Sequence, residues 1–295
     1  MKSMAAWVES INVAEIPVLR RTMQEFERLS GHAETLSAAE IATVVLHDPL
    51  MTLKILHLVN NMNRGRLNHE ITTVEQAFIM AGVNLFFRHF SDVTMLEDKL
   101  PERAQAGVLP LMSRAHHAAW QARDWAIVHA DLKAEEVYIG ALLHSIGEML
   151  LWCFAPVIAL QIENVAKRKQ VAAEEAQLEV LGFTLMDLQL ALASAWNLPE
   201  TLRMFMDDEA AVRPRIKEVG IATSIARRAA TSWYDPGLLS DYTAFAASLH
   251  IHLDDAITMI HHNAVVEAKH WEWYGVPPSA TWLPMLPGRW PESGN

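Results

Sequence analysis

The chain has 295 residues, enough to bury a large hydrophobic core, and 51% hydrophobic against 20% charged residues excludes a disordered protein. The net charge of −11 argues against a surface that binds nucleic-acid phosphates. The only cysteine, Cys153, excludes an intrachain disulfide. Since it lies between Trp152 and Phe154, we predict an inert buried thiol in a cytoplasmic protein.

Helical periodicity runs through the chain, and no good run of the period-two alternation of strands appears. Helix starts are predicted by three capping pairs and by one Asp-Pro step, which are Ser37/Glu40, Thr73/Gln76, Thr184/Asp187 and Asp48–Pro49. Gly82 and Gly182 are each placed to end a helix. The sequence therefore predicts an all-α protein.

The predicted helices fall into two groups, at about 14–100 and 108–235. Residues 98–107 are polar and rich in turn formers, so we predict a hinge there. A C-terminal extension, 236–295, is predicted to hold two further helices and then a tail rich in tryptophan and proline.

The most apolar stretch, from Tyr138 to Trp152 (YIGALLHSIGEMLLW), is predicted to form one central core helix. It carries His144, Ser145 and Glu148, and buried polar groups of this kind need hydrogen-bond or metal partners. Residues 141–160 are apolar enough to suggest a membrane span, but the same polar groups and Pro156 argue against one. We expect no membrane association.

Several segments, in their order along the chain, resemble the HDOD family, helical signalling domains related to HD-type metal phosphohydrolases. They are IPVLRRTMQEFERL (16–29), LSAAEIATVVLHDPLMTLKILHLVNN (36–61), ITTVEQAFIMAG (71–82), the His116–His117 helix, GALLHSIGEMLL (140–151) and EVLGFTLMDLQLALASAWNLPETL (179–202). The motif positions are Asp48, Pro49, Asn60, Asn61, Gly82 and Gly147. The resemblance covers about residues 14–235 and implies a multi-helix HD-like bundle of bacterial type.

One departure from the HD pattern bears on chemistry. An HD-type site holds divalent metals with imidazoles and carboxylates and lowers the pKa of a bound water. Where metal-binding relatives carry a His-Asp dyad, this chain has His144–Ser145, and a neutral hydroxyl is a poor ligand for a hard cation. We therefore expect no catalytic residue, no metal and no cofactor. A degenerate pocket is expected around His116, His117, His144, Ser145 and Glu148.

The resemblance implies a non-catalytic module that transmits a signal by contact with other signalling proteins. We expect the contact in the groove between the N-terminal helical group and the group that holds His144. Two alternatives stay open: a divergent phosphohydrolase using His117 and His144, and a nucleotide or small-molecule sensor using the degenerate pocket. The simplest interpretation of His117 and His144 is a pair of core histidines bonded to backbone or to Glu148. The oligomeric state is open.

The C-terminal extension contains two further groups of interest. The histidines His250, His252, His261, His262 and His270 lack the spacing of known metal motifs and are expected to form a solvated face. The aromatic residues of the tail are expected to pack back onto the chain's own surface rather than against a partner; these are Trp271, Trp273, Tyr274, Trp282 and Trp290.

Overall fold

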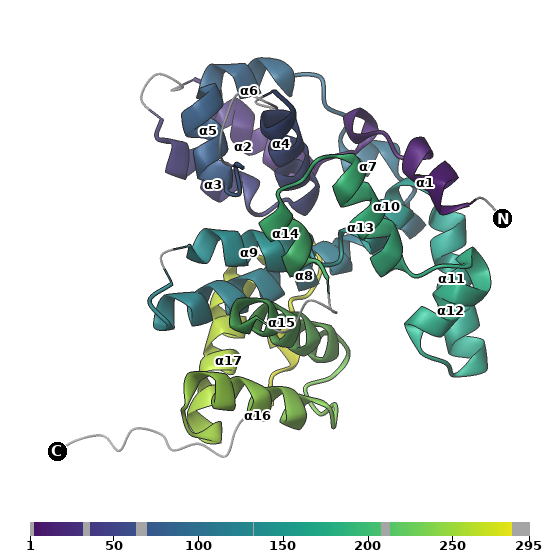
Figure 1. Cartoon of the computed structure of the whole chain (residues 1–295), viewed down its shortest axis with the longest axis vertical. Helices are drawn as coiled ribbons and strands as arrows, with labels where there is room; N and C mark the ends of the chain where they lie inside the picture. The colour runs from purple at the N-terminus through teal and green to yellow at the C-terminus, as the bar shows by residue number, and fades with distance from the viewer. Residues whose placement is uncertain (1–2, 32–35, 63–69, 132, 208–212, 285–295) are drawn as a thin grey trace.

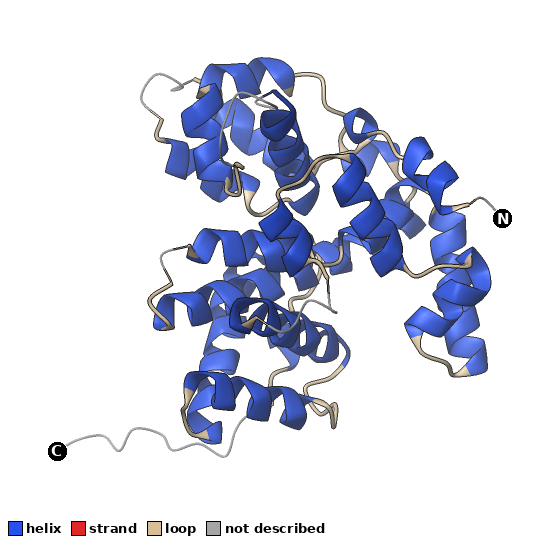
Figure 2. Ribbon diagram, in the orientation of Figure 1, coloured by secondary structure: helices blue, strands red, loops and turns tan. Residues whose placement is uncertain are grey.

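The computed structural model describes residues 3–31, 36–62, 70–131, 133–207 and 213–284. Within these ranges the chain consists of α- and 3-10 helices, joined by turns, with a single isolated bridge between Val18 and Met95 (Figure 2). The all-α prediction is confirmed. Trp290 lies outside the described residues.

The N-terminal helical group lies at one end of the molecule, at the top of Figure 1. Two short elements precede it, α1 (Met4–Ser10) and the 3-10 helix η1 (Val13–Glu15). Its own members are α2 (Arg20–Ser30), α3 (Ala38–Val45), α4 (Pro49–Met62), α5 (Val74–Ala81) and α6 (Val83–His89). Phe78 and Phe86 close its core with an edge-to-face contact at 4.4 Å between ring centroids.

The longest helix, α8, is the centre of the rest of the fold (Figure 1). It spans Glu102–Val128 and follows the short α7 (Leu96–Lys99). Around it pack α9 (Ala134–Leu143), α10 (Ile146–Phe154), α15 (Pro214–Thr231) and α17 (Leu253–Glu267). The remaining helices are α11 (Pro156–Lys169), α12 (Ala173–Leu181), α13 (Leu185–Ala195), α14 (Glu200–Phe205) and α16 (Leu238–Leu249), with the 3-10 helices η3 (Ala268–Trp273) and η4 (Ser279–Trp282).

Two predictions about the helices are wrong. Residues 102–107, predicted as part of a hinge, form the first turns of α8; their polar side chains belong to the start of a helix. The predicted division into groups at 14–100 and 108–235 stays a prediction. The stretch 138–152, predicted as one helix, is two helices, α9 and α10, bent by 41°.

The bend between α9 and α10 has a local cause and a packing cause. The N–H of His144 bonds to the carbonyl of Ala141, three residues back, and Ser145 has φ −111° and ψ 25°, so the α-helical ladder stops there. Gly147 lies so close to α13 that an added Cβ would be 2.7 Å from the Leu185 carbonyl oxygen. The change of direction brings α10 against α13, and the continuous apolar pattern gives no sign of it.

The capping predictions are confirmed. Ser37 with Glu40 and Thr184 with Asp187 form complete capping boxes at α3 and α13. Thr73 accepts the N–H of Gln76 at the start of α5. Gly82, at φ 79°, and Gly182, at φ 85°, end α5 and α12 in conformations that favour glycine.

Cys153 is buried in α10, as predicted, and burial raises the pKa of its thiol to about 12. No single helix among the described residues is both long and apolar enough to cross a bilayer. Two bent pairs, α9 with α10 and α12 with α13, reach that length and composition only when they are joined across bends of 41° and 68°.

Candidate functional site

Asp48 is the centre of a buried hydrogen-bond cluster at the start of α4. Its Oδ1 accepts the N–H groups of Leu50 and Met51, both at 3.0 Å, and so caps the helix. Its Oδ2 accepts the N–H of Leu19 at 2.8 Å and the hydroxyl of Thr22 at 3.0 Å. Burial raises the pKa of Asp48 to about 6, and these four donors favour the carboxylate. The Asp-Pro motif thus fixes α4 against the start of α2.

Lys54, one turn further along α4, is also almost completely buried. Its Nζ donates to the carbonyls of Val13, Ala14 and Ile16 at 2.9 to 3.0 Å. Burial lowers the pKa of Lys54 to about 8, while the three oxygens favour the ammonium form. Lys54 therefore holds the segment before α2 against α4.

A groove of about 850 Å³ runs along α4 from Lys54 to Met62. Its walls are the segment 11–14, residues 54–62 of α4, residues 89–93 at the end of α6 and just after it, and Trp196 at the end of α13. The groove lies along the N-terminal part of the fold, Trp196 is its lining residue from the later helices, and its polarity is mixed. Its apolar lining includes Leu58, Met62 and Val93.

The two asparagines at the end of α4, beside this groove, form hydrogen bonds with different segments. Asn60 bonds to both backbone groups of Ile71, donating to the carbonyl at 2.9 Å and accepting the N–H at 3.1 Å, and so positions the segment before α5. The Oδ1 of Asn61 accepts from the amide of Asn197 at 3.2 Å. His57 Nδ1 lies 3.2 Å from the Trp196 carbonyl. These contacts tie α4 to the end of α13.

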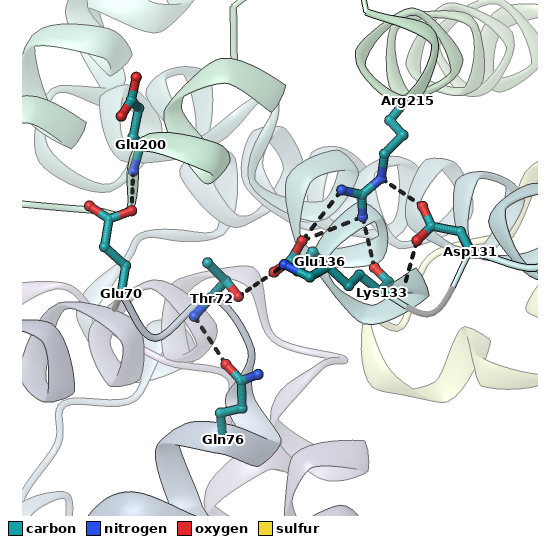
Figure 3. A network of polar contacts seen from close by, with 8 residues as sticks. All are labelled: Glu70, Thr72, Gln76, Asp131, Lys133, Glu136, Glu200 and Arg215. Carbon is teal, nitrogen blue, oxygen red and sulfur yellow. Dashed lines mark hydrogen bonds and ion pairs between the residues drawn. The ribbon is translucent and has the colours of Figure 1, made fainter. Parts of the chain in front are cut away.

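A second polar contact joins the two sides of the molecule (Figure 3). Glu136, at the start of α9, is buried, and its Oε1 accepts the hydroxyl of Thr72 at 2.6 Å. Arg215 of α15 pairs with its Oε2 at 3.4 Å and with Asp131 at 2.6 Å. The neighbouring Glu135 accepts the N–H groups of Val74 and Glu75, at the N-terminus of α5, where a negative charge is favourable.

Three of the predicted pocket residues lie around the bend between α9 and α10. His144 and Ser145 are half-buried in the bend itself. Glu148, half-buried one turn later, pairs with Arg114 of α8 at 3.0 Å. The sequence analysis did not find Arg114, because no spacing rule relates an arginine on α8 to a carboxylate 34 residues further along the chain.

His116 and His117, on α8, have other partners. His116 Nδ1 lies 2.8 Å from Oε1 of Glu267, at the end of α17. The amide of Gln121 donates to His117 Nε2 at 3.1 Å, which leaves Nδ1 to donate to the hydroxyl of Ser279 at 3.1 Å. Within the described ranges no cluster of three or more His, Cys, Asp or Glu side chains is arranged to hold a metal ion.

The late histidines divide into two sets. His250, His252 and His262 are exposed, as predicted. His261 and His270 are not part of a solvated face: His261 lies against Trp233 and 3.3 Å from the Tyr242 hydroxyl, and His270 bonds to His47. Because their partners come from other elements, helix periodicity alone could not separate the two sets.

The tail aromatics also divide. Trp273 and Tyr274 pack back onto the domain, as predicted: Trp273 stacks on His47, and Tyr274 is buried. Trp271 and Trp282 are exposed over 48% and 70% of their surface, so the prediction is wrong for these two. They lie in short 3-10 helices that present them to solvent.

Sequence comparison assigns the fold to a family. The HDOD domain matches residues 16–211, which include the Asp48 cluster, the wall of the groove that α4 forms and the bend at His144. The chain belongs to the HDOD domain family. A search of curated proteins finds no significant match.

Solved structures resemble this HDOD chain over most of its length. The response regulator MmoQ from Methylococcus capsulatus has a TM-score of 0.64 at 16% identity, covering 83% of this chain and 98% of MmoQ. A virulence factor from Campylobacter jejuni has a TM-score of 0.67 at 17% identity, covering 88% and 94%. An HDOD domain protein of unknown function from Geobacter sulfurreducens has a TM-score of 0.51 at 18% identity, covering 92% and 97%. At these identities the likeness shows the fold.

Proposed function

We propose that this HDOD chain is a signal-transduction module that acts through protein–protein contacts and has no hydrolase activity. The observation that carries the proposal is the ion pair between Arg114 and Glu148 beside His144–Ser145. The carboxylate one turn from His144 is neutralised by a guanidinium, and the residue after His144 is a serine. A fixed positive charge at this place opposes a divalent cation and occupies the carboxylate of Glu148.

The likeness to MmoQ, described as a response regulator, supports a role in signalling. Such a module needs a surface for its partner and a connection from that surface to the rest of the fold. The groove along α4 offers both. Its apolar lining can bury side chains of a partner, and its lining adds Trp196 of the later helices to residues of the N-terminal part, so a partner that reaches Trp196 contacts both.

The first experiment tests the absence of hydrolysis. The full chain is incubated with Mn²⁺ or Fe²⁺, desalted, analysed for metal, and assayed with a cyclic dinucleotide and an activated phosphodiester. We expect substoichiometric metal and no turnover. Stoichiometric metal with hydrolysis that His144→Ala abolishes would contradict the proposal and favour the divergent phosphohydrolase. Ser145→Asp combined with Arg114→Ala serves as the comparison, since it restores the missing negative charge.

The second experiment tests the groove. Met62→Glu with Val93→Glu places two charges in its apolar lining. The matched control, Val157→Glu with Leu178→Glu, adds the same charge at two exposed positions on α11 and α12. In affinity capture from the native lysate, we expect the groove variant to lose about tenfold or more of the partner captured by the unmodified chain, and the control to retain it. Equal capture by both variants would place the contact elsewhere.

A further inference from the structure

The C-terminal segment from Glu267 to Ser279, here called the strap, crosses between two parts of the fold. It begins at the end of α17, which packs on α8, and it lies beyond the HDOD match at residues 16–211 (Figure 1). The Asp48 cluster, the groove and the bend are all formed without it. Its side chains nevertheless supply the partners of three buried histidines of the HDOD region, His47, His116 and His117.

On the N-terminal helical group, the strap binds the turn between α3 and α4. His47 Nδ1 donates to the Thr43 carbonyl at 2.7 Å, so its Nε2 accepts from His270 Nδ1 at 3.1 Å. Trp273 stacks on the His47 ring with centroids 4.3 Å apart and planes 9° apart. The hydroxyl of Tyr274 donates to the His47 carbonyl at 2.8 Å. One residue thus receives three contacts from the strap.

On α8, the strap binds the face that carries the paired histidines. Glu267 accepts from His116, and Ser279 accepts from His117. The rings of His116 and His47 stack with their centroids 4.9 Å apart, so the residue that the strap binds on α8 contacts the residue that it binds before α4. The strap therefore covers the contact between α8 and the N-terminal helical group. This contact, which His116 and His47 form, is here called the seam.

The seam is less completely bonded than the Asp48 cluster beside it. Glu267 Oε2 and His116 Nε2 are buried without a hydrogen-bond partner among the described residues. Burial raises the pKa of Glu267 and lowers the pKa of His116 to about 3, so the histidine is neutral and the pair lacks a full ionic attraction. Buried polar atoms without partners lower the cost of opening a contact, because water can satisfy them once it opens.

The strap also has a short route to the groove. The strap contacts both the ring and the backbone carbonyl of His47. His47 directly precedes Asp48, which caps α4. Residues 54–62 of α4 form one wall of the groove. A shift of the peptide between residues 47 and 48 therefore moves the start of the helix that shapes the groove.

We infer that the strap is a conformational latch, which holds α8 against the N-terminal helical group through His47, His116 and His117 and so sets the shape of the groove along α4. The regulatory meaning of the latch rests on the proposed function, since the groove is the proposed partner surface. The latch itself does not: it is a property of the fold that can be measured without a partner.

The test is hydrogen–deuterium exchange on the full chain. The latch variant, Tyr274→Phe with His270→Leu, removes two hydrogen bonds to His47 while keeping apolar volume. The matched control, Tyr242→Phe with His261→Leu, removes the same groups from a Tyr–His pair within α16 and α17. Tyr274→Phe alone is the milder variant should the double variant fold poorly.

We expect the latch variant to accelerate exchange about tenfold in residues 43–49, the turn between α3 and α4, and in residues 113–121, as two lost hydrogen bonds imply. The control should accelerate exchange only in α16 and α17. Unchanged exchange in residues 43–49 would overturn the latch, and so would a uniform rise in every helix, which would make the strap an ordinary part of the core. If the latch variant behaves as expected while groove variants capture the partner normally, the latch stands and the proposed function fails.

Discussion

Two buried polar clusters meet at the peptide between His47 and Asp48, and they are built differently. The four donors around Asp48 satisfy both of its carboxylate oxygens. In the seam beside it, Glu267 and His116 share one hydrogen bond, and each keeps a buried atom without a partner among the described residues. A fully bonded charged cluster is costly to open, whereas a partly bonded one gains hydrogen bonds to water when it opens.

The comparison separates a fixed element from a movable one. Asp48 joins α4 to the start of α2 within a single helical group, and any motion that breaks it exposes a charge and four donors together. The seam joins segments that are distant in the sequence. Its contacts are stacked rings, a hydrogen bond to the His47 carbonyl and hydrogen bonds between polar side chains. A module that passes a state between its parts needs a rigid unit and a contact that can change, and these two clusters supply one of each.

The largest change in the free energy of unfolding is expected at Asp48, and its absence would break the comparison. Asp48→Ala should lower the free energy of unfolding by about 4 kcal/mol, because four buried donors lose a charged acceptor. Urea unfolding followed by circular dichroism measures the change. A loss below about 1 kcal/mol would show that the cluster is not the fixed element described here.

A smaller change in the free energy of unfolding is expected when the pH is lowered, and it depends on the histidines of the seam. Burial lowers the pKa of His47 and of His116 to about 3, so the unfolded chain binds protons at these positions below pH 6.5 while the folded chain does not. Their contribution to stability is complete above pH 6.5 and is lost as the pH falls. Between pH 7 and pH 5 the loss is about 2 kcal/mol for each histidine.

Urea unfolding at pH 7, 6 and 5 checks this expectation by comparing the unmodified chain with His116→Gln. The variant should lose about 2 kcal/mol less than the unmodified chain over this range, since one titrating group is removed. Equal pH dependence of the two proteins would show that the His116 imidazole is as easily protonated in the folded chain as in the unfolded one.

The smallest change in the free energy of unfolding is expected at Glu267. It gives the most direct contrast between the seam and the Asp48 cluster. Glu267→Gln should change the free energy of unfolding by less than about 1 kcal/mol, because the amide oxygen still accepts from His116 and no buried carboxyl remains. Asp48→Asn is the matched substitution in the other cluster. It should cost about 2 kcal/mol, since its amide group faces donors. Similar costs at both positions would remove the distinction between the clusters.

The two clusters also differ in how far the sequence could predict them. The caps at Ser37, Asp48 and Thr184 were predictable because each signal lies within four residues of the helix start that it specifies. The family motif also includes Asn61, which the structure places in the lining of the groove. These features are local, or belong to a motif with a regular spacing.

The seam and the bend were not predictable in the same way. His47 and His270 are 223 residues apart, and His116 and Glu267 are 151 residues apart, so no periodicity relates them. The bend at His144–Ser145 lies inside an unbroken apolar pattern, and its packing cause is the approach of Gly147 to the Leu185 carbonyl on another helix. Tertiary contacts of this kind leave no pattern in a single sequence.

The most direct test of this account is native-state hydrogen exchange on the unmodified chain at neutral pH, comparing the opening free energies of the strap and of α4. The account predicts that amides of strap residues 268–279 exchange through a local opening well below the global free energy of unfolding, whereas the central amides of α4 exchange only when the chain unfolds. The same opening free energy for both segments would contradict it, because the strap would then be as fixed as the Asp48 cluster.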